Sequence, residues 1–323
     1  MAWPASAPSW DILNKLFYGS YRQLLAYNTQ LFNQNTRGGL LLSSGPAIQG
    51  DYEKMSYFKN LSGLIRDRDI TSTAAVSPIT FEMDNTARVK YAKGTPPVEL
   101  TEHQYTWIAK SPEEGVAALA QQLAEYTLAN NLSTAVNALI AANTNVGATL
   151  TYNGTAGTPS LAGLTNAAQL WGDRANNIAC WVMHSKSFTD LQLAGLLNAT
   201  QLFKFDNVNI MADQMGRPFI VSDLPELVYT DTGNTRYHIL GLSPGAVKLE
   251  AGQDFKPLFW EVGGGENITA FWQAQWTNNI ELKGFSWNTA VVRPTTAQLG
   301  TGTNWIKKAV SVKDCGAILA NFQ

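Results

Sequence analysis

The chain has 323 residues, of which only 15% are charged, whereas about a quarter is usual in soluble domains. Its formal net charge of -2 excludes a basic nucleic-acid-binding domain and an acidic tail, and its 11% aromatic content excludes a disordered chain. No apolar run approaches the roughly 18 residues of a membrane span, and residues 1–5 lack the features of a secretory signal. The sequence therefore predicts a large folded protein, made in the cytoplasm, with Asn, Gln and Thr where charges are usual.

Residues 9–33 have the period of an amphipathic helix. Five apolar residues fall near one face of it: Trp10, Leu13, Phe17, Leu24 and Leu31. A helix at the end of a chain usually packs on the core. Because glycines follow at residues 38 and 39, an arm that packs elsewhere is an open alternative.

A β-hairpin is predicted at about residues 79–92. Apolar residues alternate from Ile79 to Met83 and again from Ala87 to Tyr91, and residues 84–86 indicate the turn between them. Three basic residues lie on or next to the second strand: Arg88, Lys90 and Lys93. A projecting hairpin has little core of its own, so we expect its strands to pack on something else.

A long helix is the clearest prediction from the sequence. Ser111, Pro112 and Glu114 have the pattern of a capping box, and an apolar stripe continues to about residue 142. A continuous helix over this range spans roughly 45 Å at 1.5 Å per residue. Asn130 and Asn131 offer a point where it could bend. We expect this helix to form a spine across the molecule.

The remaining chain predicts a mixture of short and long elements. Short helices and strands alternate over residues 178–255, which favours a compact α+β unit. Apolar residues alternate strictly over residues 268–276 and continue from Ile280, with a turn signal at Asn278 and Asn279. These patterns predict long strands near the C-terminus.

The cysteines and histidines predict neither a disulfide framework nor a metal site. Cys180 lies in an apolar segment and is predicted to be a small buried side chain, and two cysteines form no disulfide framework at this length. His103, His184 and His238 share no metal-ligand spacing. We therefore expect neither a metal nor a cofactor.

Three further motifs fail to predict catalysis. Residues 241–245 match a hydrolase nucleophile elbow, but a strand is predicted to follow and no histidine occurs after His238. The glycines at 263–265 lack the Lys-Ser/Thr of a phosphate-binding loop. Glu53, Asp67 and Asp69 lie near basic residues and favour a salt-bridge cluster over an acid–base pair. We expect no catalytic residue and no enzyme activity.

The order of these parts resembles the major capsid protein of tailed bacteriophages, the Hong Kong 97-type fold. Local segments are also similar to this family: residues 181–188 (WVMHSKSF), residues 216–225 (GRPFIVSDLP), and residues 293–316 near the C-terminus. The resemblance covers nearly the whole chain and implies an α+β fold of five parts. They are an N-terminal arm with a helix (1–50), a linker and extended loop (51–110, the loop at about 72–106), a peripheral domain with the spine helix (111–177), an axial domain (178–255), and closing strands of the peripheral domain (256–323).

The resemblance also implies assembly. Many copies would form pentamers and hexamers of an icosahedral shell that encloses packaged double-stranded DNA, as a virion capsid made in the cytoplasm of a bacterial host. Portal, decoration or scaffolding proteins would be partners, and a membrane would not. The extended loop would lie over a neighbouring copy and pair Arg88, Lys90 and Lys93 with its acidic residues. The arm helix would contact another copy through its apolar residues Leu13, Phe17 and Leu24.

Two alternatives stay open at this point. An encapsulin-like compartment shell with the same fold would package enzymes rather than DNA. A β-rich carbohydrate-binding protein or hydrolase would fit the Trp, Asn and Thr content. The low charge favours a shell subunit, because uncharged polar side chains can hydrogen-bond across contacts between copies without the desolvation cost of ions.

Overall fold

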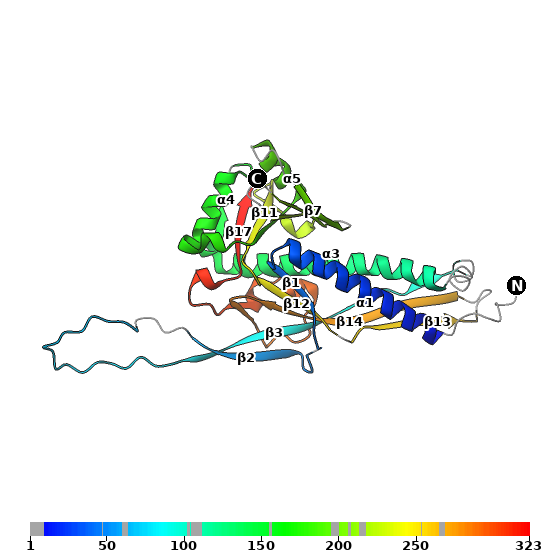
Figure 1. Ribbon diagram of the computed structural model, residues 1–323, viewed down its shortest axis with the longest axis horizontal. Coiled ribbons are helices and arrows are strands. Elements are labelled where there is room, and N and C mark those ends of the chain that lie inside the picture. Colours follow the sequence, from blue (N-terminus) through cyan, green and yellow to red (C-terminus); the bar gives the residue numbers. More distant parts are fainter. Residues whose placement is uncertain are drawn as a thin grey trace.

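Helix α3 (Pro112–Val146) crosses the middle of the molecule, between a seven-stranded sheet and a compact unit built on an eight-stranded sheet (Figure 1). The structure is a computed structural model. It describes residues 10–46, 48–59, 64–101, 104, 112–154, 157–194, 200–205, 208–212, 218–252, 254–264 and 269–323.

The predicted spine helix is confirmed, and it is longer than expected. Its first half packs in a core with Val116 and Leu123, and its second half packs in the larger core with Leu128 and Leu139. The helix continues through Asn130 and Asn131 without a break. The predicted cap at Ser111 lies outside the described residues. Helix α3 therefore joins the two hydrophobic cores of the subunit.

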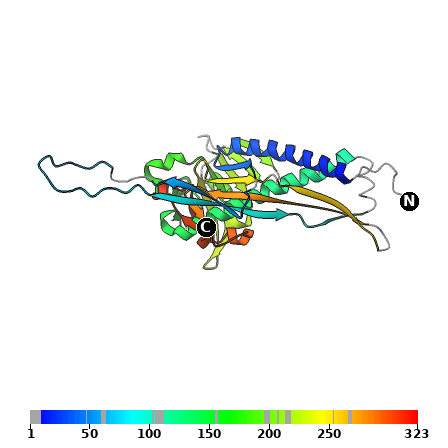
Figure 2. The same cartoon turned by 90° about the horizontal axis from the view of Figure 1, so that it is seen from below.

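The N-terminal helix α1 (Trp10–Asn35) is also confirmed, and it lies alongside α3 (Figure 2). Four of its hydrophobic side chains are buried within the subunit: Leu13, Phe17, Tyr21 and Phe32. Phe17 packs on Trp272 with ring centroids 4.9 Å apart, and the Tyr21 hydroxyl donates to Thr127 of α3. Of the two predicted placements, the structure has the one in which the helix packs on its own core.

The seven-stranded sheet is organised around one long strand, β14 (Thr269–Leu282), which pairs with four others. Its strand order is β1-β12-β14-β3-β2, with β13 and β4 also pairing β14, and only the β1–β12 pair is parallel. The other strands are β1 (Leu40–Ser44), β2 (Tyr52–Phe58), β3 (Met83–Gly94), β4 (Val98–Leu100), β12 (Val247–Ala251) and β13 (Lys256–Val262).

The predicted turn at Asn278 and Asn279 is wrong, because both residues lie inside β14 and are buried. Buried side-chain amides need partners. The Asn278 amide donates to Asn131 Oδ1 at 3.2 Å and to Tyr91 Oη at 3.4 Å, and the Asn279 amide donates to Pro46 O at 3.3 Å. These tertiary partners override the local preference of Asn-Asn for a turn.

The predicted hairpin at residues 79–92 is also wrong. Strand β3 runs unbroken from Met83 to Gly94 and pairs with β2, so that Asp84 lies opposite Tyr57 and Asn85 opposite Ser56. Turn-type residues are tolerated here because their side chains have partners outside the strand: Asp84 pairs with Lys308, and Asn85 accepts from Ser56. Residues 79–82 belong instead to a loop that joins β2 and β3.

The eight-stranded sheet forms the compact unit at the top of Figure 1, flanked by α4 (Leu161–Ala168) and α5 (Ser185–Leu193). Its order is β5-β17-β11-β6-β9-β8-β7, and β10 also pairs β11. The strands are β5 (Thr151–Asn153), β6 (Cys180–Met183), β7 (Thr200–Phe205), β8 (Val208–Ala212), β9 (Pro218–Ser222), β10 (Val228–Asp231), β11 (Asn234–Leu242) and β17 (Ala317–Phe322).

The fold accounts for Gly241, the first glycine of the motif at residues 241–245 that matches a nucleophile elbow. It lies in β11 between Trp181 and Ile318, and a Cβ there would come within 2.8 and 2.9 Å of their side chains. Ser243 then leads into a turn, and strand β12 follows rather than a helix. The residues at this motif therefore serve sheet packing and a turn.

Short elements complete the chain: 3-10 turns at Gly147–Thr149, Gln169–Asn177, Pro225–Leu227, Gly302–Asn304 and Val312–Asp314, helix α6 (Thr296–Leu299), and the strand pair β15 (Phe285–Trp287) and β16 (Trp305–Lys307). Three strands lie in another sheet than the predicted domain boundaries imply. β12 lies in the seven-stranded sheet, whereas β5 and the C-terminal β17 lie side by side in the eight-stranded sheet of the compact unit. The division of the chain at residues 178 and 255 stays a prediction.

Candidate assembly surface

A long loop between β2 and β3 extends away from the body of the molecule, continuing the line of the two strands (Figures 1 and 2). We call residues 59–82 the extended loop; its described residues are 59 and 64–82. Residues 64–82 contain neither helix nor strand, and each of them is exposed. The hydrogen bonds between described residues of its outer part are local, such as that from the Thr71 amide to Asp69.

The extended loop carries a series of exposed large apolar side chains: Leu64, Ile65, Ile70, Val76, Ile79 and Phe81. Ile65 is 95% exposed and Ile70 is 85% exposed. Burying a side chain of this size is worth about 1.5–3 kcal/mol, and soluble proteins rarely leave several such residues exposed together. The loop is therefore a surface suited to being covered by another chain.

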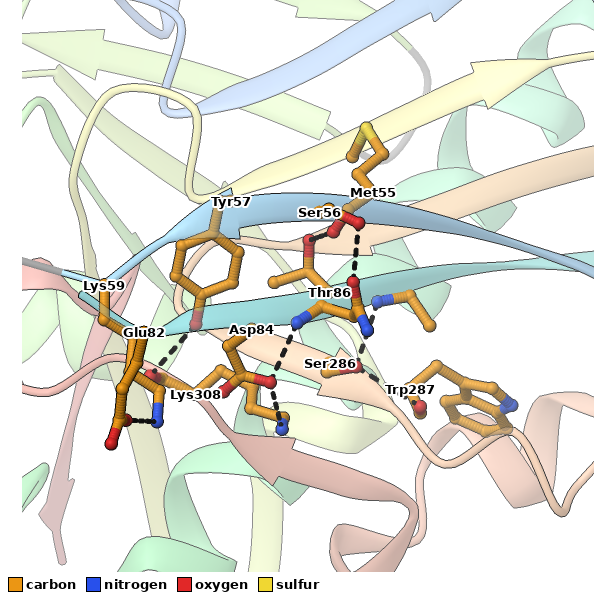
Figure 3. Close-up of polar contacts among 12 residues, drawn as sticks. Met55, Ser56, Tyr57, Lys59, Glu82, Asp84, Thr86, Ser286, Trp287 and Lys308 are labelled. Atoms are coloured by element: carbon orange, nitrogen blue, oxygen red, sulfur yellow. Dashed lines mark hydrogen bonds and ion pairs between the residues drawn. The ribbon is translucent and has the colours of Figure 1, made fainter. Parts of the chain in front are cut away.

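The root of the extended loop is held by contacts with the segment around β15 and β16 (Figure 3). The Lys308 ammonium lies 2.9 Å from an Asp84 carboxylate oxygen, and the Tyr57 hydroxyl donates to the Lys308 carbonyl at 3.4 Å. The Ala87 amide donates to Ser286 Oγ at 2.9 Å. The hydrogen bond from Lys308 holds the pKa of Asp84 below its usual range. The loop thus begins from a fixed base.

A second set of contacts closes the loop where it leaves the sheet. The Lys59 amide donates to the Glu82 carbonyl at 3.0 Å, and their side chains form an ion pair at 2.8 Å. Beside them, the rings of Phe58 and Phe81 stack with centroids 4.5 Å apart, although both side chains are more than half exposed. These pairs keep the two strands together up to the point where the loop opens.

The predicted assembly residue Arg88 lies on β3 and has partners within the subunit. Its guanidinium bonds Glu53 of β2 at 2.6 Å and Glu250 of β12 at 2.7 Å. Burial by itself would lower the pKa of Arg88. The nearby carboxylates of Glu53 and Glu250 have the larger combined effect, so the pKa of Arg88 is raised above its usual value. Burial likewise raises the pKa of Glu250, and Lys248 and Arg88 together hold it below its usual range. Arg88 therefore joins three strands across one face of the sheet.

Lys90 and Lys93 also have partners in the same chain. Lys90 donates to the Ile48 carbonyl at 2.9 Å, and Lys93 donates to Thr296 Oγ1 at 2.8 Å while lying over the Tyr91 ring. Burial lowers the pKa of Lys93. All three predicted basic residues thus belong to the sheet that supports the extended loop. Pairing with a neighbouring copy stays a prediction.

The apolar residues predicted for the arm helix lie within the subunit core. Leu13 and Phe17 are fully buried, and Leu24 is partly buried against the same cluster. In this conformation they pack on their own chain, and a contact with a neighbouring copy stays a prediction. The outer face of α1 exposes Ile12 and Tyr27 instead.

The resemblance implies an extended loop at about residues 72–106, whereas the loop that joins β2 and β3 comprises residues 59–82. Its apolar residues were assigned to a strand from Ile79 to Met83, and the segment before Ile70 gave no pattern. In this segment the apolar residues repeat neither every 2 residues, as in a strand, nor every 3.6 residues, as in a helix. Such a pattern over so long a segment favours a loop whose apolar side chains are covered by another chain.

The described residues contain no helix that is both long and apolar enough to cross a membrane. Among the same residues, no group of three or more His, Cys, Asp or Glu side chains is arranged to hold a metal ion.

Comparisons with known proteins identify a family whose model matches this chain. The model of the Gp13-like family, described as "Major capsid protein 13-like", matches residues 10–319. Three solved structures have a similar fold. The capsid asymmetric unit of cyanophage Pam1 is 12% identical, with 85% of this chain and 86% of that chain covered and a TM-score of 0.49. A chain from Mycobacterium phage Bobi is 13% identical (88% of this chain and 89% of that chain covered, TM-score 0.49), and the capsid of Ralstonia phage GP4 is 8% identical (88% of this chain and 86% of that chain covered, TM-score 0.45). No curated protein matches the sequence.

Proposed function

The chain belongs to the Gp13-like family of major capsid proteins, and from this premise we propose that its copies assemble into pentamers and hexamers of an icosahedral shell of the Hong Kong 97 type. The shell encloses double-stranded DNA, and the subunit's role is structural rather than catalytic. It is assembled in the cytoplasm of the bacterial host, with a portal and decoration or scaffolding proteins as partners.

The exposed apolar side chains of the extended loop are the observation that carries this proposal. Ile65 and Ile70 have no place in the subunit's own core, and the loop extends well beyond the sheet from which it starts (Figure 1). A second copy offers a surface that is present at every position of a closed shell. Each such contact is modest, and their repetition over the shell makes the assembly stable.

The fixed root supports the same proposal. A loop that must reach a defined site on a neighbour needs a constant direction at its base, since ordering it only on contact costs conformational entropy. The Asp84–Lys308 ion pair and the stacked Phe58 and Phe81 supply that base.

Electron microscopy of the purified protein tests the proposal. We expect closed particles of uniform size with five- and six-fold arrangements of density. Nuclease-protected DNA in particles from infected cells distinguishes a virion shell from an encapsulin-like compartment, which would hold protein cargo. Monomers under all conditions of salt, pH and protein concentration would contradict the proposal.

A further inference from the structure

A groove of about 820 Å³ lies where the compact unit meets the C-terminal end of α3. Residues 137–145 of α3 form one wall, and the turn at residues 300–303, after α6, forms another. The third wall consists of side chains from β5, β10, β11 and β17 of the eight-stranded sheet. The volume is within the range of about 300–1,000 Å³ that is typical of small-ligand sites.

The groove is polar but uncharged. None of the described residues that line it is Asp, Glu, Lys or Arg, whereas four are asparagines and four are threonines. Burial lowers the pKa of His238, the one histidine in the lining, so its imidazole adds no charge at pH 7. An ionic ligand would find no opposite charge here, and an apolar ligand would leave the amides and hydroxyls unpaired. The lining therefore favours a neutral ligand with many hydrogen-bonding groups.

Three polar side chains form a row across the sheet wall. Asn153 of β5 lies opposite Asn321 of β17, which lies opposite His238 of β11. The Asn321 amide donates to Asn153 Oδ1 at 2.7 Å, and Asn321 Oδ1 lies 2.7 Å from His238 Nδ1. In this arrangement Nδ1 carries the proton of the imidazole, and its other nitrogen is an acceptor. The row thus holds the polar groups of this wall in fixed directions.

An aromatic ring completes the same wall. Tyr229 of β10 stacks on His238, with ring centroids 4.1 Å apart and an angle of 9° between the ring planes. The Tyr229 hydroxyl accepts a hydrogen bond from Arg236, which is itself paired with Asp231 at 2.9 Å. Tyr229 remains partly exposed. A ring fixed in this way offers flat apolar area beside the polar groups of the groove.

The walls opposite the sheet offer side chains that are open to a ligand. Thr144, Asn145 and Thr303 are exposed, and none of these side chains hydrogen-bonds to another residue of the described chain. Gly302 keeps the two walls close, because a Cβ there would come within 2.6 Å of the Ala141 carbonyl oxygen of α3. An amide and a hydroxyl each supply both a donor and an acceptor.

We propose that this groove binds a neutral carbohydrate, whose hydroxyl groups bond to Asn145 and Thr303 and whose ring packs on Tyr229. A sugar is uncharged, each of its hydroxyls both donates and accepts, and the C–H face of its ring is apolar, as the three features of the lining require. An extended peptide shares the hydrogen bonding but has no ring to place on Tyr229. This inference goes beyond assembly, because all residues of the groove come from one copy.

Titration calorimetry of the full chain tests the proposal. Glucose, galactose and N-acetylglucosamine are the monosaccharide probes, and maltotriose and chitotriose are the trisaccharide probes. We expect at least one of them to bind, and Asn145→Ala to weaken that binding about fivefold by removing a donor and an acceptor. Asn166→Ala makes the same change at an exposed position of α4 outside the groove, and it should leave binding within twofold.

Two substitutions of Tyr229 test the role of its ring. Tyr229→Ala removes the ring and should weaken binding about tenfold, whereas Tyr229→Phe keeps the ring and should leave binding within twofold. Urea unfolding of each variant checks that the chain is folded. A trisaccharide that binds at least tenfold more tightly than its monosaccharide indicates a polysaccharide as the source of the ligand, and equal affinities indicate a free sugar.

Several results would overturn the proposal. They are that no sugar binds, that Asn145→Ala binds as tightly as Asn166→Ala, or that Tyr229→Ala binds as tightly as Tyr229→Phe. Tighter binding of glucuronate than of glucose would show that the site prefers an anion. Tighter binding of a neutral peptide of Gly, Asn and Thr than of every sugar would show that the groove accepts protein instead.

Discussion

Asp84 and Lys308 are separated by 224 positions in the chain, yet their side chains lie 2.9 Å apart at the root of the extended loop (Figure 3). Asp84 is the second residue of β3, the strand that returns from the loop, and Lys308 follows β16 in the C-terminal segment. The pair therefore links the direction of the loop to the body of the subunit.

The Asp84–Lys308 pair predicts a pH-dependent contribution to stability. The Lys308 hydrogen bond and the Asn85 amide hold the pKa of Asp84 below its usual range. A carboxyl whose pKa is depressed by folding stabilises the native state above its unfolded pKa of about 3.9, and that contribution is lost as the pH falls through the folded pKa. We expect Asp84→Asn to lower the free energy of unfolding by about 0.2–1 kcal/mol at pH 7.

Urea unfolding of the subunit between pH 7 and pH 3 measures this contribution. The difference between wild type and Asp84→Asn should shrink across the acid range. At pH 7, a double-mutant cycle with Lys308→Gln should show a favourable coupling between the two side chains. Additive effects of the two substitutions would mean that the pair contributes nothing.

The position of Phe17 predicts that the N-terminal helix is part of the folding core. Phe17→Ala removes a fully buried ring from contact with Trp272 and Phe259, and such truncations cost about 3–5 kcal/mol. Ile12→Ala on the same helix is a matched control, because Ile12 is 50% exposed, and it should change the free energy of unfolding by less than about 0.5 kcal/mol. Similar urea midpoints for the two variants would show that α1 is not part of the core.

The helices and most strands were predictable from sequence because their patterns are local. The apolar stripe of α3 continues over many turns, and neither Asn130 nor Asn131 carries enough local preference to interrupt it. The two wrong turn predictions, within the hairpin and at Asn278–Asn279, have one cause in common. Asp84, Asn278 and Asn279 have side chains typical of turns, but partners from distant parts of the chain hold them in strands. Sequence spacing does not show such partners.

The candidate site was predictable only in part for a related reason. Basic residues from Arg88 to Lys93 were assigned to a neighbour because their cross-strand partner Glu53 and the distant Glu250 could not be foreseen. Exposed apolar residues such as Ile65 look in sequence like any core residue.

The buried amide contact of Asn278 predicts a measurable cost on removal. Asn278→Ala removes the donor to the side-chain oxygen Oδ1 of Asn131. A buried polar atom without a hydrogen-bond partner lowers the free energy of unfolding by about 1–3 kcal/mol. Gln275→Ala lies on the same strand at an exposed position and serves as the control. Chemical unfolding should show a clear loss for the first variant and little change for the second. Equal stability of both would indicate that the Asn278–Asn131 contact does not form.

The extended loop predicts a variant that folds normally and assembles poorly. Ile65→Ser combined with Ile70→Ser removes two side chains that contribute nothing to the subunit's own core. We expect an unchanged urea midpoint and at least a tenfold lower yield of particles by electron microscopy and sedimentation. The control combines Thr73→Ala with Ser77→Ala, which alters polar residues of the same loop and should leave the particle yield near that of wild type. Normal particles from the isoleucine variant would rule out these side chains as assembly contacts.

The two cysteines predict the chemical behaviour of the folded subunit. Both are free and buried, and burial raises the pKa of Cys180 to about 12 and that of Cys315 to about 11. The thiolate is the reactive form, so at pH 8 neither side chain offers a reactive or accessible sulfur. We expect iodoacetamide to label neither residue in the native chain and both in guanidinium chloride, as measured by mass spectrometry of peptides. Rapid native labelling of Cys180 would show that the strand β6 opens, because its sulfur lies in the core shared by both sheets.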